Sequence, residues 1–137
     1  MILYQFPTSP FARRVRLALA HKGLTAEFRD ARAVPEHREV VNRLNPMHTV
    51  PVLVERDLIL HESNIINEYI DERFPHPQLM PGDPVMRAKA RQLLSGMERE
   101  IFAHIEALEK NAKTADKARQ VIRERLIELA PIFTKQK

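Results

Sequence analysis

No cysteine occurs among the 137 residues of the chain. Disulfide bonds, thiolate metal ligands and thiol nucleophiles are therefore excluded, so an enzyme built on this chain would need another nucleophile. No apolar stretch is long enough to cross a bilayer, and Met1 leads into a strand-like segment instead of a charged leader with an apolar core. Internal repeats and low-complexity tracts are also absent. These features predict a cytoplasmic globular protein with one domain, or with one small domain and an appendage.

Charge of one sign is only modestly in excess. The net charge is +4, and residues 1–80 are balanced, with ten Lys and Arg against ten Asp and Glu. The excess lies in residues 81–137, where twelve basic residues stand against eight acidic ones. Acids alternate with bases in residues 119–125, which is typical of a solvated helix face. We therefore expect no direct contact with nucleic acid.

Strand and helix signals alternate along the first part of the chain. The expected elements are a strand at residues 2–6, a helix from Ser9 and Pro10 to Gly23, a strand at 26–30, a helix at 35–44, a hairpin of strands 50–55 and 58–61, and a helix at 62–73. Their order, β-α-β-α-β-β-α, is the thioredoxin-like arrangement of a mixed sheet with helices on its faces. The predicted fold class is therefore α/β.

A proline-dense segment follows this pattern. The ten residues 75–84 contain Pro75, Pro77, Pro81, Gly82 and Pro84. Such a composition is typical of a semi-rigid connector. We predict a thioredoxin-like domain at residues 1–76, a linker at 77–84 and a helical part at 85–137.

The helical part carries apolar residues at helical spacing in two segments, separated by a break at residues 111–115. The first segment has Ala90, Leu94, Met97, Ile101, Ile105 and Leu108, and the second has Ala118, Ile122, Leu126, Leu129 and Phe133, with Pro131 near its end. Two helices with one apolar stripe each bury too little surface for an independent core. We therefore expect an incomplete all-α domain whose second stripe promotes self-association.

Two positions carry the local signals of a ligand site. Ser63 is expected to cap the helix that it opens, where unpaired N–H groups and the helix dipole favour an anion. Ser9 stands at the start of the first helix, where its hydroxyl either caps the helix or donates to a bound thiolate.

The Val50-Pro51 pair stands at the start of a strand, where proline cannot donate to the ladder. Its peptide bond is expected to be cis, as in thioredoxin-like sheets, and the alternative is a trans proline on an edge strand.

His76 stands between Pro75 and Pro77. Each proline fixes its own φ and restricts the residue before it, so His76 is expected to be extended with an exposed ring. No partner lies at ligand spacing from this histidine, and we expect no metal site. The segment is thus either an inert linker or a rigid surface feature.

The succession of Asn45-Pro46, Val50-Pro51, the hairpin and Glu62-Ser63 resembles the glutathione transferases. In that family, the pair equivalent to Glu62-Ser63 holds the γ-glutamyl end of glutathione. The stretch Thr8-Ser9-Pro10-Phe11 resembles the Cys-Pro-Phe opening of cysteine-type members, with Ser9 in place of the cysteine. The resemblance implies a glutathione-dependent transferase that uses Ser9 as its catalytic residue, with Val50, Pro51, Glu62 and Ser63 around glutathione. His48 and Thr49 depart from the pattern, because the family commonly has glycine and a longer polar or basic residue there.

The segment from Leu53 to Pro81 resembles more specifically the stringent starvation protein A family, and so does the stretch from Ala115 to Phe133. That family has the glutathione-transferase fold, and its members are dimeric stress-response regulators of transcription that bind RNA polymerase, generally without transferase activity. The resemblance implies docking to RNA polymerase holoenzyme through Pro75, His76 and Pro77, without a cofactor. Tyr69, two turns earlier, is expected beside them. The family's helical domain continues beyond the equivalent of Lys137, so we expect a shortened one here.

Overall fold

The computed structural model describes residues 1–110 and 113–134. The chain divides into two compact units, Met1–Met80 and Pro81–Lys137. The first unit is built on a four-stranded sheet in the order β2-β1-β3-β4. Its strands are β1 (Ile2–Gln5), β2 (Glu27–Asp30), β3 (Val52–Glu55) and β4 (Leu58–His61).

The sheet is mixed, as the order of elements predicts. β1 pairs with β2 in parallel, and Leu3 lies opposite Phe28. On its other side β1 is antiparallel to β3, with Leu3 opposite Leu53. β4 returns antiparallel to β3 and places Leu60 opposite Leu53. A parallel pair needs a crossover connection, which the first helix supplies.

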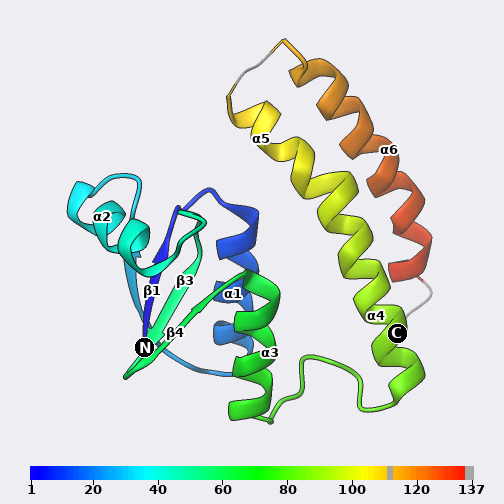
Figure 1. Cartoon of the computed structure of the whole chain (residues 1–137). Helices are drawn as coiled ribbons and strands as arrows, with labels where there is room; N and C mark the ends of the chain where they lie inside the picture. Colours follow the sequence, from blue (N-terminus) through cyan, green and yellow to red (C-terminus); the bar gives the residue numbers. More distant parts are fainter. Residues whose placement is uncertain (111–112, 135–137) are drawn as a thin grey trace. The chain divides into compact units, whose positions relative to one another are not determined.

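Helices cover both faces of this sheet (Figure 1). They are α1 (Pro10–His21), α2 (Pro35–Leu44) and α3 (Ser63–Arg73). Successive side chains of a strand point to opposite faces. Leu3 therefore packs with residues of α1 and α3, whereas its neighbour Tyr4 packs with Val41 of α2.

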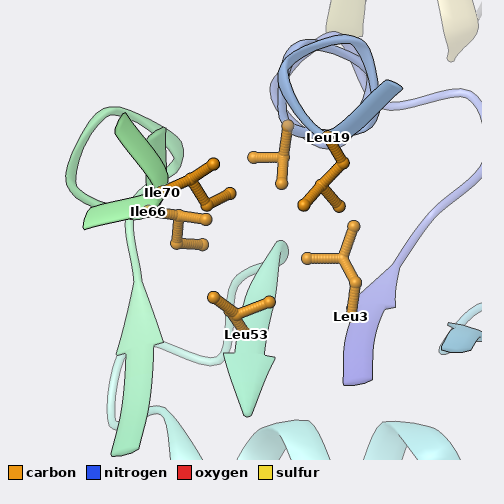
Figure 2. Close-up of a cluster of buried hydrophobic side chains, with 6 residues drawn as sticks. Leu3, Leu19, Leu53, Ile66 and Ile70 are labelled. Atoms are coloured by element: carbon orange, nitrogen blue, oxygen red, sulfur yellow. The ribbon is translucent and has the colours of Figure 1, made fainter. Parts of the chain in front are cut away.

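The main core lies between the sheet and the pair α1 and α3. Figure 2 shows its side chains converging from two strands and two helices. The cluster consists of Leu3, Val15, Leu19, Leu53, Ile66 and Ile70, each at most 1% exposed. Burial of each of these side chains contributes about 1.5–3 kcal/mol to the stability of the fold. Packing of these residues fixes the ends of α1 and α3 relative to the sheet, and both candidate sites described below lie at those ends.

The limits of α1 follow from its terminal residues. Ser9 is the N-cap, and its hydroxyl accepts a hydrogen bond from the N–H of Ala12 at 3.3 Å. Pro10 occupies the first helical position, where its missing N–H costs nothing. Beyond the helix, Gly23 has φ +67°, a conformation that is strained for other residues. The expected start and stop signals are therefore confirmed.

The second unit is helical. Its first helix is continuous in sequence through α4 (Pro84–Met97), the π-helical turn η1 (Glu98–Phe102) and α5 (Ala103–Glu109), and α6 spans Ala115–Thr134. The structure thus interrupts the expected uniform helix with a π turn. α5 ends at Glu109 and α6 begins at Ala115, so the interval between these helices starts and ends one residue before the expected break at residues 111–115. Residues 111 and 112 lie outside the described residues.

The helices of this unit pack through few buried residues. Ile101 of η1 is 6% exposed, and Ala115 and Ala118 of α6 are 8% and 3% exposed. The guanidinium Nε of Arg125 lies 3.6 Å from the carboxylate of Glu100. Pro131 lies inside α6, near its end, as predicted. Within residues 1–110 and 113–134, none of the helices is long and apolar enough to span a membrane.

Candidate functional site

Three of the predicted site segments meet at one end of the sheet. β3 runs antiparallel to both β1 and β4, so β1 ends, β3 begins and β4 ends on the same side. Ser9 follows β1, the Val50-Pro51 pair precedes β3, and the Glu62-Ser63 pair follows β4. We call this region the serine end of the sheet. The chain segments predicted to surround glutathione are therefore gathered together by the strand register.

The hydroxyl of Ser9 is already engaged as a helix cap. It accepts from the N–H of Ala12, and its side chain is half-buried. A hydroxyl that accepts one hydrogen bond keeps its own proton to donate. Ser9 therefore serves as the cap, and its expected role toward a thiolate stays a prediction.

The peptide bond between Val50 and Pro51 is cis, which confirms the expectation from the sequence. Pro51 is buried and Val50 is half-buried at the entry to β3. The bond between His76 and Pro77 is also cis, which the sequence analysis did not predict.

Ser63 does not cap α3, contrary to the expectation. The N-cap position belongs to Glu62, which has φ +72° and makes no side-chain capping bond. Ser63 is the first helical residue, and it is only 2% exposed. Its hydroxyl accepts a hydrogen bond from Nε of Arg14 at 2.8 Å. A cation from α1 thus stands at the N-terminus of α3, where the helix dipole favours negative charge.

The segment before Val50 is shaped by one buried side chain. Asn45 is 0% exposed, and its Nδ2 donates to the carbonyl and to the hydroxyl of Thr49, at 2.8 and 3.0 Å. Its Oδ1 accepts from the N–H of Met47 at 3.0 Å. His48 has φ +56°, the region that glycine enters most easily. The backbone is thus left-handed at the position where glutathione transferases commonly have glycine, although this chain carries a histidine there.

The other predicted site lies at the opposite end of the first unit. α3 starts at the serine end and is 11 residues long, which corresponds to about 16 Å. Beyond its end lie Pro75, His76 and Pro77, all exposed, which we call the Pro-His-Pro loop. α1 also starts at the serine end, so its last residues lie near this loop.

Lys22, directly after α1, holds the Pro-His-Pro loop. Its side chain is 0% exposed, and Nζ donates to Oδ1 of Asp71 at 2.8 Å and to the carbonyl of Pro77 at 2.7 Å. Nζ also donates to the carbonyl of Phe74, on the other side of the loop. Asp71 accepts in addition from the N–H of Leu79 at 2.9 Å.

These contacts set the protonation of Asp71. Its burial would raise the pKa of the carboxyl, but the hydrogen bonds from Lys22, Leu79 and Met80, with the charge of Lys22, outweigh burial and lower that pKa. The carboxylate is therefore ionised at neutral pH and forms an ion pair with Lys22.

Tyr69 lies on α3, two residues before Asp71. Its hydroxyl donates to the carboxylate of Glu55, at the end of β3. This hydrogen bond, together with burial, raises the pKa of the phenol. Tyr69 also packs against the main core. Its expected place in a docking surface stays a prediction.

Metal ligands do not cluster in the part of the chain that the structure describes. No group of three His, Asp or Glu side chains comes together there in an arrangement that could hold an ion.

Residues 3–78 match the family described as "Glutathione S-transferase, N-terminal domain". The chain belongs to this family. Over 134 residues it is 40% identical to a stringent starvation protein A homolog of Coxiella burnetii, covering 97% of this chain and 64% of the relative. The resemblance to that group, derived from the sequence, is thereby confirmed. The chain spans less than two thirds of the length of this relative.

Other relatives are glutathione transferases by name. Glutathione S-transferase U1 of Arabidopsis thaliana is 43% identical over 90 residues, which are 65% of this chain and 40% of that protein. Among solved structures, FzlA from C. crescentus superimposes with a TM-score of 0.84 at 30% identity, covering 98% of this chain and 67% of FzlA. The glutathione-transferase-like thioredoxin fold predicted from the sequence is confirmed.

The residues that the sequence analysis missed are Arg14, Lys22 and Asp71. Arg14 reaches Ser63 and Lys22 reaches Asp71, each across 49 positions of sequence. In the sequence, Lys22 stands directly before the helix-terminating Gly23 and looks like an ordinary exposed residue at the end of a helix. Only the packing of α1 against α3 shows that it is buried.

Proposed function

We propose that the chain acts as an RNA polymerase-associated transcription regulator of the stringent starvation protein A type. The similarity to homologs of that name supports the proposal. The observation that carries it is the construction of the Pro-His-Pro loop. Its side chains are exposed, while the carbonyl of Phe74 before it and that of Pro77, its last residue, are bound by the buried side chain of Lys22. An exposed but fixed loop suits docking, because less conformational entropy is lost when the partner binds.

The loop would act as an anchor within a larger surface. A stable protein interface buries about 800 Å² on each partner, more than three residues provide. The neighbouring surface offers Arg73, whose guanidinium carbon lies 4.9 Å from the centre of the Phe74 ring. Arginine and aromatic side chains are enriched among residues that carry binding energy. We therefore include this pair beside the Pro-His-Pro loop in the proposed docking surface.

The proposal includes the wider expectations from the resemblance. The partner is RNA polymerase holoenzyme, the chain works as a homodimer in the cytoplasm during the stress response, and it has no direct contact with nucleic acid. Regulation then proceeds by protein docking, without a cofactor.

The test compares polymerase binding by the natural chain and by His76→Ala combined with Pro77→Ala. Gln78→Ala is the matched control, because Gln78 is the next exposed residue. We expect the double substitution to lower the affinity for RNA polymerase holoenzyme at least about tenfold, or 1.4 kcal/mol, and the control to leave it unchanged. Circular dichroism checks that both variants fold. Equal recovery of polymerase by the natural chain and the double variant in a pull-down would refute the proposal.

A second candidate function is a glutathione-dependent transferase with Ser9 as the group that stabilises the thiolate. The Arg14 guanidinium at the N-terminus of α3, beside the buried Ser63, supports an anion site there. In this function Val50 and Glu62 would hold the backbone of glutathione. His48 and Thr49 stand where glutathione transferases commonly have glycine and a longer polar or basic residue. This departure from the pattern favours the docking function instead. Measured affinity for glutathione separates the two functions.

A further inference from the structure

Lys22 occupies an unusual position for a lysine. Lysine is almost never fully buried unless it is paired, yet the side chain of Lys22 is 0% exposed. A lysine ammonium has three N–H donors. At Lys22 the three acceptors are Asp71, Phe74 and Pro77, so every donor has a partner in the structure.

Two of the three acceptors of Lys22 lie at the two ends of the Pro-His-Pro loop. Phe74 directly precedes the Pro-His-Pro loop, and Pro77 is its last residue. Asp71 in turn accepts from the N–H of Leu79 at 2.9 Å and from that of Met80 at 3.4 Å. Lys22 therefore binds the carbonyls at the two ends of the loop, and Asp71 binds the chain after it, while the loop side chains stay exposed.

The loop has little else to order its backbone. Proline has no N–H, so Pro75 and Pro77 cannot donate hydrogen bonds. The carbonyl of Pro77 is instead bound by a side chain from α1, 55 positions away. Removal of that side chain would free the carbonyls of Phe74 and Pro77 without touching any exposed residue.

We infer that Lys22 is the positioning residue of the Pro-His-Pro loop, holding it in the conformation that docks. This inference rests on the proposed function of the loop. When only a fraction of molecules has the competent conformation, the apparent affinity falls by that fraction. Lys22 thus acts on partner binding from a buried place where the partner cannot touch it.

The test uses Lys22→Met combined with Asp71→Asn. Methionine keeps an unbranched apolar stem without donors, and the second substitution avoids a stranded buried charge. The asparagine amide oxygen still accepts from Leu79, so the main loss is the link to the carbonyls of Phe74 and Pro77. Asp71→Asn alone is the control for the second substitution, because the asparagine Oδ1 and the two carbonyls can still accept from Lys22 although the ion pair is lost, and its melting temperature reports the cost of the unpaired charge. Lys89→Met controls for the same change at an exposed lysine.

Two readouts are measured on each variant. The first is the NMR order parameter of the backbone amides of His76 and Gln78, and the second is the affinity for RNA polymerase holoenzyme. For the Lys22→Met and Asp71→Asn combination we expect order parameters to fall from about 0.85 to below about 0.6. We expect the affinity to fall about tenfold, as when a tenth of the molecules stay competent. Both controls should keep both values.

The outcomes separate this inference from the proposed function. Unchanged order parameters in the double variant overturn the inference, even if its melting temperature falls, because Lys22 would then only stabilise the fold. A mobile loop with unchanged affinity also overturns it, provided that His76→Ala with Pro77→Ala does weaken binding. If that loop variant leaves binding unchanged, the proposed docking function fails, and a drop in the order parameters still establishes that Lys22 orders the loop.

Discussion

Arg14 on α1 donates a hydrogen bond from Nε to the hydroxyl of Ser63 at the start of α3, over 2.8 Å. The relationship joins the N-terminal parts of two helices that pack on the same face of the sheet. It also places a guanidinium at the N-terminus of α3, where the helix dipole favours negative charge. Whether the serine end binds glutathione is decided by measurement of its affinity.

We expect glutathione to bind this chain weakly or not at all. Thr49 is short, and its hydroxyl already accepts a hydrogen bond from Asn45. Thr49→Gln should raise the affinity severalfold, because a longer polar side chain reaches farther, whereas the matched change Thr25→Gln should not. Calorimetry measures both. A micromolar affinity of the natural chain, about −8 kcal/mol, would contradict this expectation and favour the transferase function.

Ser9→Ala should destabilise the protein through its helix cap. The hydroxyl accepts from the N–H of Ala12, and loss of an N-cap costs about 1 kcal/mol. Chemical denaturation measures the change in the free energy of unfolding, with Thr25→Ala as the control at an exposed position. If Ser9→Ala instead leaves stability intact and abolishes a glutathione-dependent reaction, the side chain is catalytic and the cap is incidental.

Two neighbouring isoleucines of α3 should respond differently to truncation. Ile66 is 0% exposed and packs in the main core, whereas Ile65 is 49% exposed. Ile66→Ala should lower the free energy of unfolding by about 2–5 kcal/mol, because it leaves a cavity. Ile65→Ala should change it by less than about 0.5 kcal/mol. Similar losses in both variants, measured in urea, would show that the two faces of α3 are wrongly assigned.

The ion pair of Lys22 and Asp71 should lose its effect in acid. The pKa of the Asp71 carboxyl is lowered on folding, so its contribution to stability is complete above the ordinary value of about 3.9. The contribution disappears as the pH falls through the lowered, folded value. The natural chain should therefore be more stable than Asp71→Asn at neutral pH, and the difference should narrow below about pH 4. Unfolding in urea at a series of pH values measures it, and a difference independent of pH would contradict the assignment.

Much of the first unit could be predicted from the sequence because its signals are local. The helix at residues 35–44 begins and ends where expected, with Pro35 at its first position. Ser9 and Gly23 mark the limits of α1 for reasons of capping and of φ. The cis bond before Pro51 followed from the resemblance of the whole arrangement to thioredoxin-like sheets.

The errors and omissions have a common cause. Ser63 was expected to cap its helix, as serines often do, but Arg14 binds its hydroxyl from another helix. The π turn at Glu98–Phe102 interrupts a stretch whose apolar spacing predicts an ordinary helix. In each case a contact or a backbone geometry outside the local pattern decides the result.

The sequence by itself determined the order of the elements in the first unit and the family, because each rests on local periodicity or on motif spacing. The tertiary structure alone decided that Lys22 is buried and that it binds the chain on both sides of the Pro-His-Pro loop. The physical reason is that α1 and α3 pack on one face of the sheet. This packing brings residues 49 positions apart within hydrogen-bond distance, which no local pattern encodes.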